Sequence, residues 1–287
     1  MAGMVVNTNM DALTIENILS NTNAAYSSSL TKLSSGLKIN TAADDPAGYA
    51  VANSFAAKIA AMNVASQNAS EAQSMLQTAD GAYSQINDIL VNMKSLATEA
   101  ASGQTDNADL TNEFQALQKE ITTIANSTTY GTKNLIDGTA ATTATGITFQ
   151  VGASNSGTDQ LSISFNGATA ACLGVDMGIA GGGSTTVQID TLAHAETAMD
   201  AIDTALTNIN AYMADVGATQ NQLQYTINNL TTSVQNYTSS QSTIKDVNMA
   251  SEISSLTKNQ ILQQSAMAML AQANAEPQNV LKLLQTV

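Results

Sequence analysis

The sequence predicts a mainly α-helical protein: a long antiparallel helical bundle or coiled coil formed by the N- and C-terminal regions, with a small central insert containing a β-hairpin. Three observations support this fold class. Only two prolines occur, Pro46 and Pro277, so about 230 intervening residues lack the strongest helix breaker. Apolar residues recur with helical spacing towards both ends of the chain. More than half of the 17 glycines lie between residues 138 and 183.

The N-terminal segment, residues 6–37, has the apolar spacing of a helix that packs along a seam. Its large apolar residues recur at intervals of seven, four, three and four, which is the rhythm of a coiled coil. These residues are Leu19, Tyr26, Leu30, Leu33 and Leu37. Gly36 and the polar stretch 40–45 interrupt the pattern and indicate a connector.

A long second helix is expected to begin at Pro46. Asp44 and Asp45 precede it, and an acidic cap followed by a proline in the first turn is typical of a helix start. The apolar pattern continues towards Gly103, which corresponds to a helix of roughly 55 residues and ~80 Å. A third helix, again apolar on one face, is expected over residues 106–126.

The middle of the chain, residues 139–190, has a different pattern. Apolar and hydroxyl residues alternate over 147–151 and 161–165, and glycines surround both segments. Alternation with a period of two between glycine-rich turns predicts short β-hairpins with one buried face.

Two more helical segments are expected after this insert. The first begins near Thr191 and runs to about Tyr237, with Asn and Gln rather than charges on its polar face. The second, 247–287, is apolar on several sides and must therefore be buried on several sides. Since one chain offers few partners for it, we expect other subunits to cover it. Its apolar residues include Ile253, Leu256, Leu262, Met269, Leu270, Val280 and Leu284.

The composition argues against nucleic acids and membranes as partners. The chain has 23 acidic residues and 9 basic ones, and a net charge of -14 repels a polyanion. All the basic residues are lysines, so no arginine can grip a phosphate with two donors. The chain contains no run of 18 apolar residues that could span a bilayer. We therefore expect no nucleic-acid binding and no membrane insertion.

Residues capable of catalysis or of metal and cofactor binding are scarce. His194 is the only histidine, which excludes any site that needs two, and we expect it at the surface or in a helix cap. Cys172 is the only cysteine, and we expect it to be a small buried residue. Helix capping accounts for Asp44 and Asp45. The sequence therefore predicts no enzyme, no cofactor and no bound metal.

The N-terminus begins Met1-Ala2-Gly3-Met4, without the charged start or the apolar core of a cleaved secretory signal. We therefore expect the chain either to stay in the cytoplasm or to leave the cell by a route that reads no cleaved signal.

Two sequence motifs at opposite ends of the chain resemble those of bacterial flagellins. The first is LTKLSSGLKIN over residues 30–40, followed by ADDPAG over residues 43–48. The second comprises NQILQQ at 259–264, LAQAN at 270–274 and PQNVL at 277–281. The resemblance covers residues 4–138 and 191–287 and leaves the insert outside it.

By this resemblance, the chain is a structural subunit that self-assembles into the bacterial flagellar filament used for motility. The twelve apolar residues named above for the two terminal segments would mediate self-assembly. The resemblance implies three domains: an inner coiled-coil layer of residues 1–45 and 239–287, a helical bundle layer of 46–138 and 191–238, and a short insert of 139–190. Within these, residues 38–45 and 239–246 would be connectors.

The family also implies a location and a set of partners. Flagellins are exported without a cleaved signal and form a helical homopolymer outside the cell. The implied partners are therefore other copies of the chain, an export chaperone, and the filament cap and junction proteins.

One site in the family differs in this chain. Many flagellins carry an Arg that contacts the flagellin-sensing Toll-like receptor, with a Leu one turn on and a Glu on the neighbouring helix. The matching positions here are Asn92, Leu96 and Glu113. Losing the guanidinium removes a charged fork of donors, so the resemblance predicts weakened receptor recognition. Leu96 and Glu113 are equally well explained as packing and surface residues.

Three alternatives to a filament subunit remain open. A hook-filament junction protein shares these terminal helices but would not polymerise indefinitely. A secreted protein could carry an enzyme in its insert, although residues 139–190 contain no histidine and only one cysteine. A soluble coiled-coil accessory of secretion would stay monodisperse at high concentration.

Overall fold

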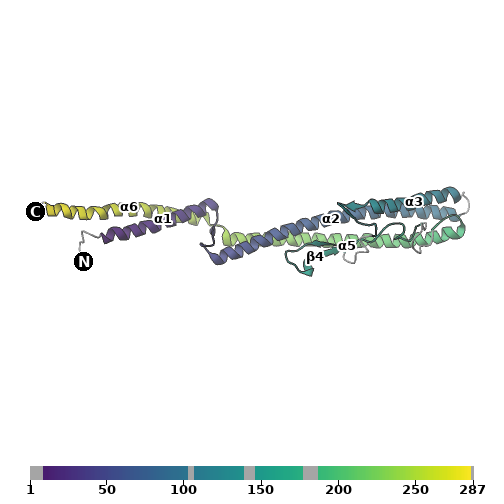
Figure 1. Ribbon diagram of the computed structural model, residues 1–287, viewed down its shortest axis with the longest axis horizontal. Coiled ribbons are helices and arrows are strands. Elements are labelled where there is room, and N and C mark those ends of the chain that lie inside the picture. Colours follow the sequence, from purple (N-terminus) through teal and green to yellow (C-terminus); the bar gives the residue numbers. More distant parts are fainter. Residues whose placement is uncertain (1–8, 103–106, 139–145, 177–186, 286–287) are drawn as a thin grey trace. The chain divides into compact units, whose positions relative to one another are not determined.

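The computed structural model describes residues 9–102, 107–138, 146–176 and 187–285, and for Asn107 and residues 277–285 it describes the backbone alone. The chain divides into two compact units. One consists of Met1–Ala57 and Asn236–Val287, and the other of Lys58–Gln235. Both are built mainly from long helices, as the sequence predicts, and two small antiparallel sheets belong to the second (Figure 1).

The first unit is dominated by two terminal helices that lie side by side in antiparallel orientation (Figure 1). Helix α1 spans Met10–Ser35, and helix α6 spans Met249–Gln285. The side chain of Asn9 caps the start of α1 by accepting a 3.0 Å hydrogen bond from the Ala12 amide. At the other end Gly36 has a φ of 72°, a conformation in which glycine carries no steric penalty, and its amide donates to the Lys32 carbonyl. Both terminal helices expected from the sequence are present.

The connectors next to these helices are joined by backbone pairing. Leu37 and Asp246 form an antiparallel bridge. On either side of it, the Lys38 amide lies 2.7 Å from the Lys245 carbonyl oxygen, and the Val247 amide lies 3.0 Å from the Gly36 carbonyl oxygen. These hydrogen bonds join two segments that are about 200 residues apart in sequence, at the point where their helices end. Such a long-range contact cannot be predicted from local helix or strand propensity.

The prediction that residues 239–246 form a connector is wrong. Helix α5 spans Leu192–Lys245 and continues through nearly all of this segment. The segment contains neither glycine nor proline, so nothing in it stops the helix. The break is limited to residues 246–248, where the Asn248 side chain accepts from the Ser251 amide and caps α6.

The two acidic residues before Pro46 have different roles. Asp45 caps helix α2 (Pro46–Ala101), because its Oδ1 accepts from the amides of Ala47 and Gly48 at 3.1 and 3.0 Å. Asp44 does not cap the helix. Its Oδ2 accepts from the amides of Asn40 and Thr41 and from the Thr41 hydroxyl, so it holds the connector in a tight turn.

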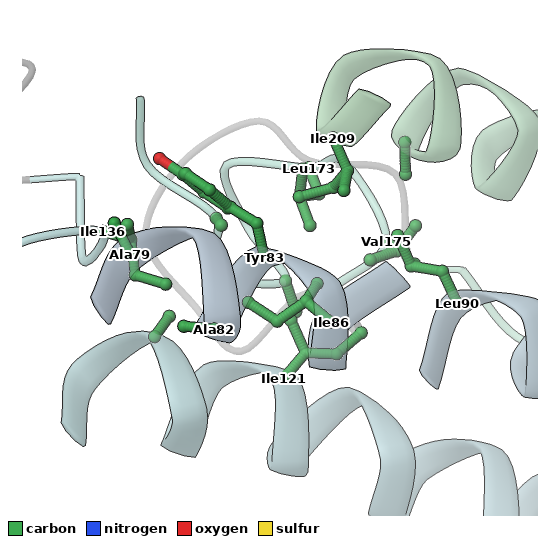
Figure 2. Close-up of a cluster of buried hydrophobic side chains, with 14 of the residues drawn as sticks. Ala79, Ala82, Tyr83, Ile86, Leu90, Ile121, Ile136, Leu173, Val175 and Ile209 are labelled. Carbon is green, nitrogen blue, oxygen red and sulfur yellow. The ribbon is translucent and has the colours of Figure 1, made fainter. Parts of the chain in front are cut away.

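The second unit contains a three-helix arrangement in which α3 (Asn107–Ser127) lies beside α2 and α5 (Figure 1). One continuous apolar cluster joins them. Its members include Tyr83, Ile86 and Leu90 from α2, Phe114 and Ile121 from α3, and Ile202 and Ile209 from α5. In Figure 2 the α2, α3 and α5 side chains converge on residues of the insert, among them Leu173 and Val175.

The insert is part of this core. Strands β3 (Ile147–Gln150) and β4 (Gln160–Ile163) pair antiparallel, with Phe149 opposite Leu161. This confirms the expected hairpin, although each strand ends one or two residues earlier than the alternation suggested. A shorter hairpin joins β1 (Thr129–Tyr130) to β2 (Lys133–Asn134), and a 3-10 turn, Gly157–Asp159, precedes β4.

A buried tyrosine ties the insert to the long helices. The Tyr83 hydroxyl donates a 2.7 Å hydrogen bond to the Asn166 carbonyl, and its ring packs against that of Tyr212. Burial raises the pKa of the Tyr83 phenol above its usual range, because the charged form would lose its hydration.

The only histidine and the only cysteine of the chain both lie at the surface. His194 is exposed, as expected, with its Nδ1 2.5 Å from Asp190 Oδ1. Cys172 is also exposed, so the prediction of a buried cysteine is wrong. The general preference of cysteine for the interior does not hold here because the residue lies in a surface turn, where its amide contacts the Thr169 hydroxyl.

Candidate assembly interface

The contact between α1 and α6 has the geometry of a coiled coil. On each helix seven residues that are buried or half-buried recur at alternating intervals of three and four, the spacing of a heptad seam, and only Lys32 and Ala275 are half-buried outside that spacing among the described residues of the two helices. On α1 they are Ala12, Ile15, Leu19, Thr22, Tyr26, Ser29 and Leu33. On α6 they are Glu252, Leu256, Asn259, Gln263, Ala266, Leu270 and Ala273.

Three contacts define how the two helices are aligned. At one end, the Asn9 side chain donates to the Ala273 carbonyl at 2.8 Å. Near the middle, Gln263 Nε2 donates to Asn23 Oδ1, also at 2.8 Å. At the other end lies the bridge between Leu37 and Asp246. Contacts at both ends and the middle of one seam leave a single antiparallel register.

Large apolar side chains outside the seam are left uncovered within the chain. Four lie on α1 and six on α6, each between 44% and 61% exposed. They are Met10, Leu13, Ile18, Leu30, Met249, Ile253, Ile261, Leu262, Met267 and Met269. Such a concentration of apolar surface on two adjacent helices is typical of a protein-binding face.

The residues that the sequence analysis assigned to self-assembly fall into three groups. Some line the seam between α1 and α6: Leu19, Tyr26, Leu33, Leu256 and Leu270. Others lie on the uncovered faces: Leu30, Ile253, Leu262 and Met269. Leu37 forms the backbone bridge. Val280 and Leu284 belong to α6, but their side chains lie outside those that the structure describes.

Sequence reasoning missed several apolar residues of the uncovered faces. Met10, Leu13, Ile18 and Ile261 were not assigned to self-assembly, although each is at least half exposed. Their positions in the sequence could have identified them, because each is a large apolar residue outside the heptad seam of its helix. An apolar residue at such a position has no partner within a two-helix pair.

The three positions aligned with the receptor site lie in the second unit. Asn92 on α2 and Glu113 on α3 are exposed, whereas Leu96 is partly buried and packs against the apolar core. Leu96 therefore has a structural role whether or not a receptor contacts it.

Among the described residues, no three His, Cys, Asp or Glu side chains are grouped so that they could hold a metal ion. Within the same portion of the chain, no helix is long and apolar enough to cross a membrane.

Comparison with known proteins identifies the family. The model of the bacterial flagellin N-terminal helical region matches residues 6–141, and that of the bacterial flagellin C-terminal helical region matches residues 199–284. The chain belongs to the bacterial flagellin family. The resemblance that the two terminal motifs indicated is thereby confirmed, and flagellins are structural proteins of the flagellar filament.

Individual flagellins match nearly the whole chain. The flagellin of Bacillus subtilis (strain 168) is 38% identical over 307 residues, covering 98% of this chain and all of the relative. A flagellar filament 33 kDa core protein of Treponema phagedenis is 36% identical, with the same coverage of both chains. The crystal structure of Bacillus cereus flagellin is 29% identical and covers 57% of this chain and 88% of its own, with a TM-score of 0.47.

Proposed function

We propose that the chain is the subunit of a flagellar filament and that it polymerises through the uncovered apolar faces of α1 and α6. The observation that carries this proposal is the set of ten large apolar side chains that the antiparallel pair leaves exposed. Burying one such half-exposed side chain contributes on the order of 1 kcal/mol, so several together supply a strong drive for association.

The chemistry of these faces favours another copy of the chain over a different partner. The net charge of -14 lies mostly outside these two helices: α1 carries only Asp11, Glu16 and Lys32 as charged residues, and α6 carries two acidic residues and two lysines, so the two faces repel each other weakly. The apolar residues occur on both helices, which allows one face to bind a different face of the next copy. Contacts of this heterologous kind produce an open helical polymer when the rotation does not close into a ring.

The proposal includes finer features taken from the family. The terminal residues 1–45 and 239–287 would form the innermost layer of the filament, residues 46–138 and 191–238 the surrounding layer, and residues 139–190 a short insert. The subunit would leave the cell without a cleaved signal and act outside it. An export chaperone, the filament cap and the junction proteins would be its further partners.

The first test is polymerisation of the purified chain, followed by sedimentation and electron microscopy. Long filaments from the full chain, and none from a variant that ends before Glu276, are the expected result. Short stacks of limited length would instead favour a junction protein. A chain that stays monodisperse at high concentration would contradict the proposal. Peptidase activity in the sedimented filaments would add a catalytic role for the insert.

A pair of substitutions tests the uncovered faces themselves. Ile261, which is 57% exposed, becomes glutamine in the test variant, and the neighbouring exposed Ser265 becomes glutamine in the control. Ile261→Gln is expected to raise the critical concentration for polymerisation about tenfold, because one apolar contact is lost from each interface. Ser265→Gln is expected to leave it nearly unchanged. Equal critical concentrations for the native chain and Ile261→Gln would show that this face is not used.

A further inference from the structure

The exposed methionines of the described residues all lie on the terminal helix pair. Each of them is between 47% and 61% exposed, and none belongs to the heptad seam between α1 and α6. They are Met10 on α1 and Met249, Met267 and Met269 on α6. These four residues belong to the ten large apolar residues of the uncovered faces. Thioether sulfur therefore makes up a substantial part of the surface that the proposed polymer would bury.

The described methionines of the second unit are shielded instead. Met62, Met75 and Met93 on α2 are at most 7% exposed. Met199 and Met213 on α5 are half-buried and pack against the apolar core. A reagent in solution thus meets the methionines of the two units very differently. Met1, Met4 and Met177 lie outside the described residues.

Accessible thioethers react with peroxides by oxygen transfer. The sulfur attacks one oxygen of hydrogen peroxide, and the O–O bond breaks as the S–O bond forms. The second oxygen leaves as hydroxide and takes up the remaining proton, so the peroxide is reduced to water while the sulfur is oxidised by two electrons. The product, methionine sulfoxide, is polar and chiral, and two reductases reverse the change, one for each epimer.

We propose that Met10, Met249, Met267 and Met269 form a peroxide-sensitive modification site that controls assembly of the subunit. The proposal rests on the proposed function, since it concerns the faces through which the chain would polymerise. In the unassembled chain all four side chains are open to the oxidant. A sulfoxide in a subunit contact buries a polar group, which costs free energy unless a hydrogen-bond donor meets it. Oxidised subunits therefore stay unassembled, and assembled subunits are protected because the contact excludes the oxidant.

This oxidation acts on association and not on folding. The four methionines belong neither to the seam that pairs α1 with α6 nor to the buried apolar cluster of the second unit. Their conversion to sulfoxides removes no contact from either of these. The helix content and the unfolding midpoint of the oxidised chain should therefore match those of the untreated chain, which separates the proposed effect from general oxidative damage.

Peroxide treatment of the full-length chain, followed by peptide mass spectrometry, tests the modification site. Cys172 is first replaced by serine, because its exposed thiol would compete for the oxidant. In the soluble chain, the four methionines of α1 and α6 should gain oxygen at least about tenfold faster than Met75 and Met93, which are buried. In the sedimented polymer their rates should fall about tenfold. Equal rates in the two groups, or no protection in the polymer, would overturn the proposal.

Polymerisation after oxidation tests the control of assembly. Each variant is compared with its own untreated sample, so that an effect of the substitutions on polymerisation itself cancels. Peroxide should raise the critical concentration of the Cys172→Ser chain at least about tenfold, and the two sulfoxide reductases should restore it. A variant with leucine at all four positions keeps apolar side chains of similar volume but has no sulfur to oxidise there, so peroxide should leave its critical concentration unchanged.

The matched control carries Met199→Leu and Met213→Leu, which remove two thioethers from the second unit. This variant should lose polymerisation on oxidation as the Cys172→Ser chain does. An equal loss in the variant with four leucines, or a loss that the reductases cannot reverse, would show that another group is responsible and would overturn the proposal. A chain that is oxidised selectively at the four methionines but never forms filaments would contradict the proposed function while the modification site stands.

Discussion

The side-chain amide nitrogen of Gln118 lies 2.6 Å from the carbonyl oxygen of Val175, deep in the core of the second unit. The same nitrogen lies 3.1 Å from the Val187 carbonyl oxygen. One side chain of α3 thereby holds two separate parts of the insert. Its own Oε1 is buried, and no hydrogen-bond partner for it is present among the described residues. Gln118 thus donates to two buried backbone carbonyl groups, while its own side-chain oxygen has no partner among the described residues.

Replacing Gln118 with leucine should therefore destabilise the second unit. The substitution leaves the carbonyls of Val175 and Val187 buried without donors, so we expect a loss of about 1–3 kcal/mol in the free energy of unfolding. Urea denaturation monitored by circular dichroism measures it. The control is Gln115→Leu, one turn earlier and only partly buried, which should change stability by less than about 0.5 kcal/mol. Equal losses in the two variants would contradict this role.

Two glycines of α2 should respond in opposite ways to alanine. A Cβ on Gly48 would lie 2.7 Å from Ile39 Cδ1 and would also meet the capping carboxylate of Asp45. Ile39 is buried, so Gly48→Ala should destabilise the start of α2 by about 1–3 kcal/mol through overpacking and a weakened cap.

A Cβ added to Gly81 would meet no other group within 4 Å, and the residue lies inside the same helix. Gly81→Ala should therefore stabilise the chain by about 0.5–1 kcal/mol, because it removes backbone freedom from the unfolded state. Thermal unfolding of both variants beside the native chain measures the two effects. If the unfolding midpoints of both variants shift in the same direction, the space around each glycine does not determine whether alanine stabilises or destabilises the chain.

The connector before α2 should loosen in acid. Hydrogen bonds from the Thr41 and Asn40 amides and from the Thr41 hydroxyl lower the pKa of Asp44 from its ordinary value of 3.8. Because the folded-state pKa is depressed, the stabilising contribution is complete above the unfolded value and is lost as the pH falls through the folded-state pKa. Carboxyl carbon NMR of the full chain follows the titration. Thr41→Val removes one of the three hydrogen bonds and should move the midpoint upwards; an unmoved midpoint would exclude that contribution.

Asn92 provides a test of the proposed receptor contact. The native chain should activate a reporter cell line that expresses the flagellin-sensing Toll-like receptor only weakly, because an amide cannot replace a guanidinium fork. Asn92→Arg should increase potency about tenfold, the change expected for a charge-assisted hydrogen bond. Asn92 is exposed, so the fold should tolerate arginine. Ser95→Arg, at another exposed position of α2, is the matched control. Full potency of the native chain with no gain in Asn92→Arg would contradict the prediction.

The extent of the helices could be predicted because their signals are local. Pro46 preceded by Asp45 marks the start of α2, and the apolar period sustains it to Ala101. The connector expected at 239–246 came from the family resemblance and not from a local signal, and α5 continues through nearly all of that segment. Cys172 was misplaced because a residue preference carries no information about where a turn meets solvent.

The residues of α1 that lie in the seam with α6 could not be predicted from the sequence. Spacing along residues 6–37 singled out Leu30 as a seam residue, yet Leu30 is 45% exposed, while Thr22 and Ser29 are buried. The reason is that apolar residues on one helix define several possible stripes, and the partner helix selects among them.

By itself, the sequence determined the helical class, the extent of α2 and α3 and the family, because hydrophobic period, capping residues and terminal motifs are all read within a few turns of chain. Only the tertiary structure decided which face of α1 meets α6, in which register, and which apolar residues remain uncovered. Those properties depend on contacts between residues more than 200 positions apart, such as Asn23 and Gln263. Nothing local to either segment specifies them.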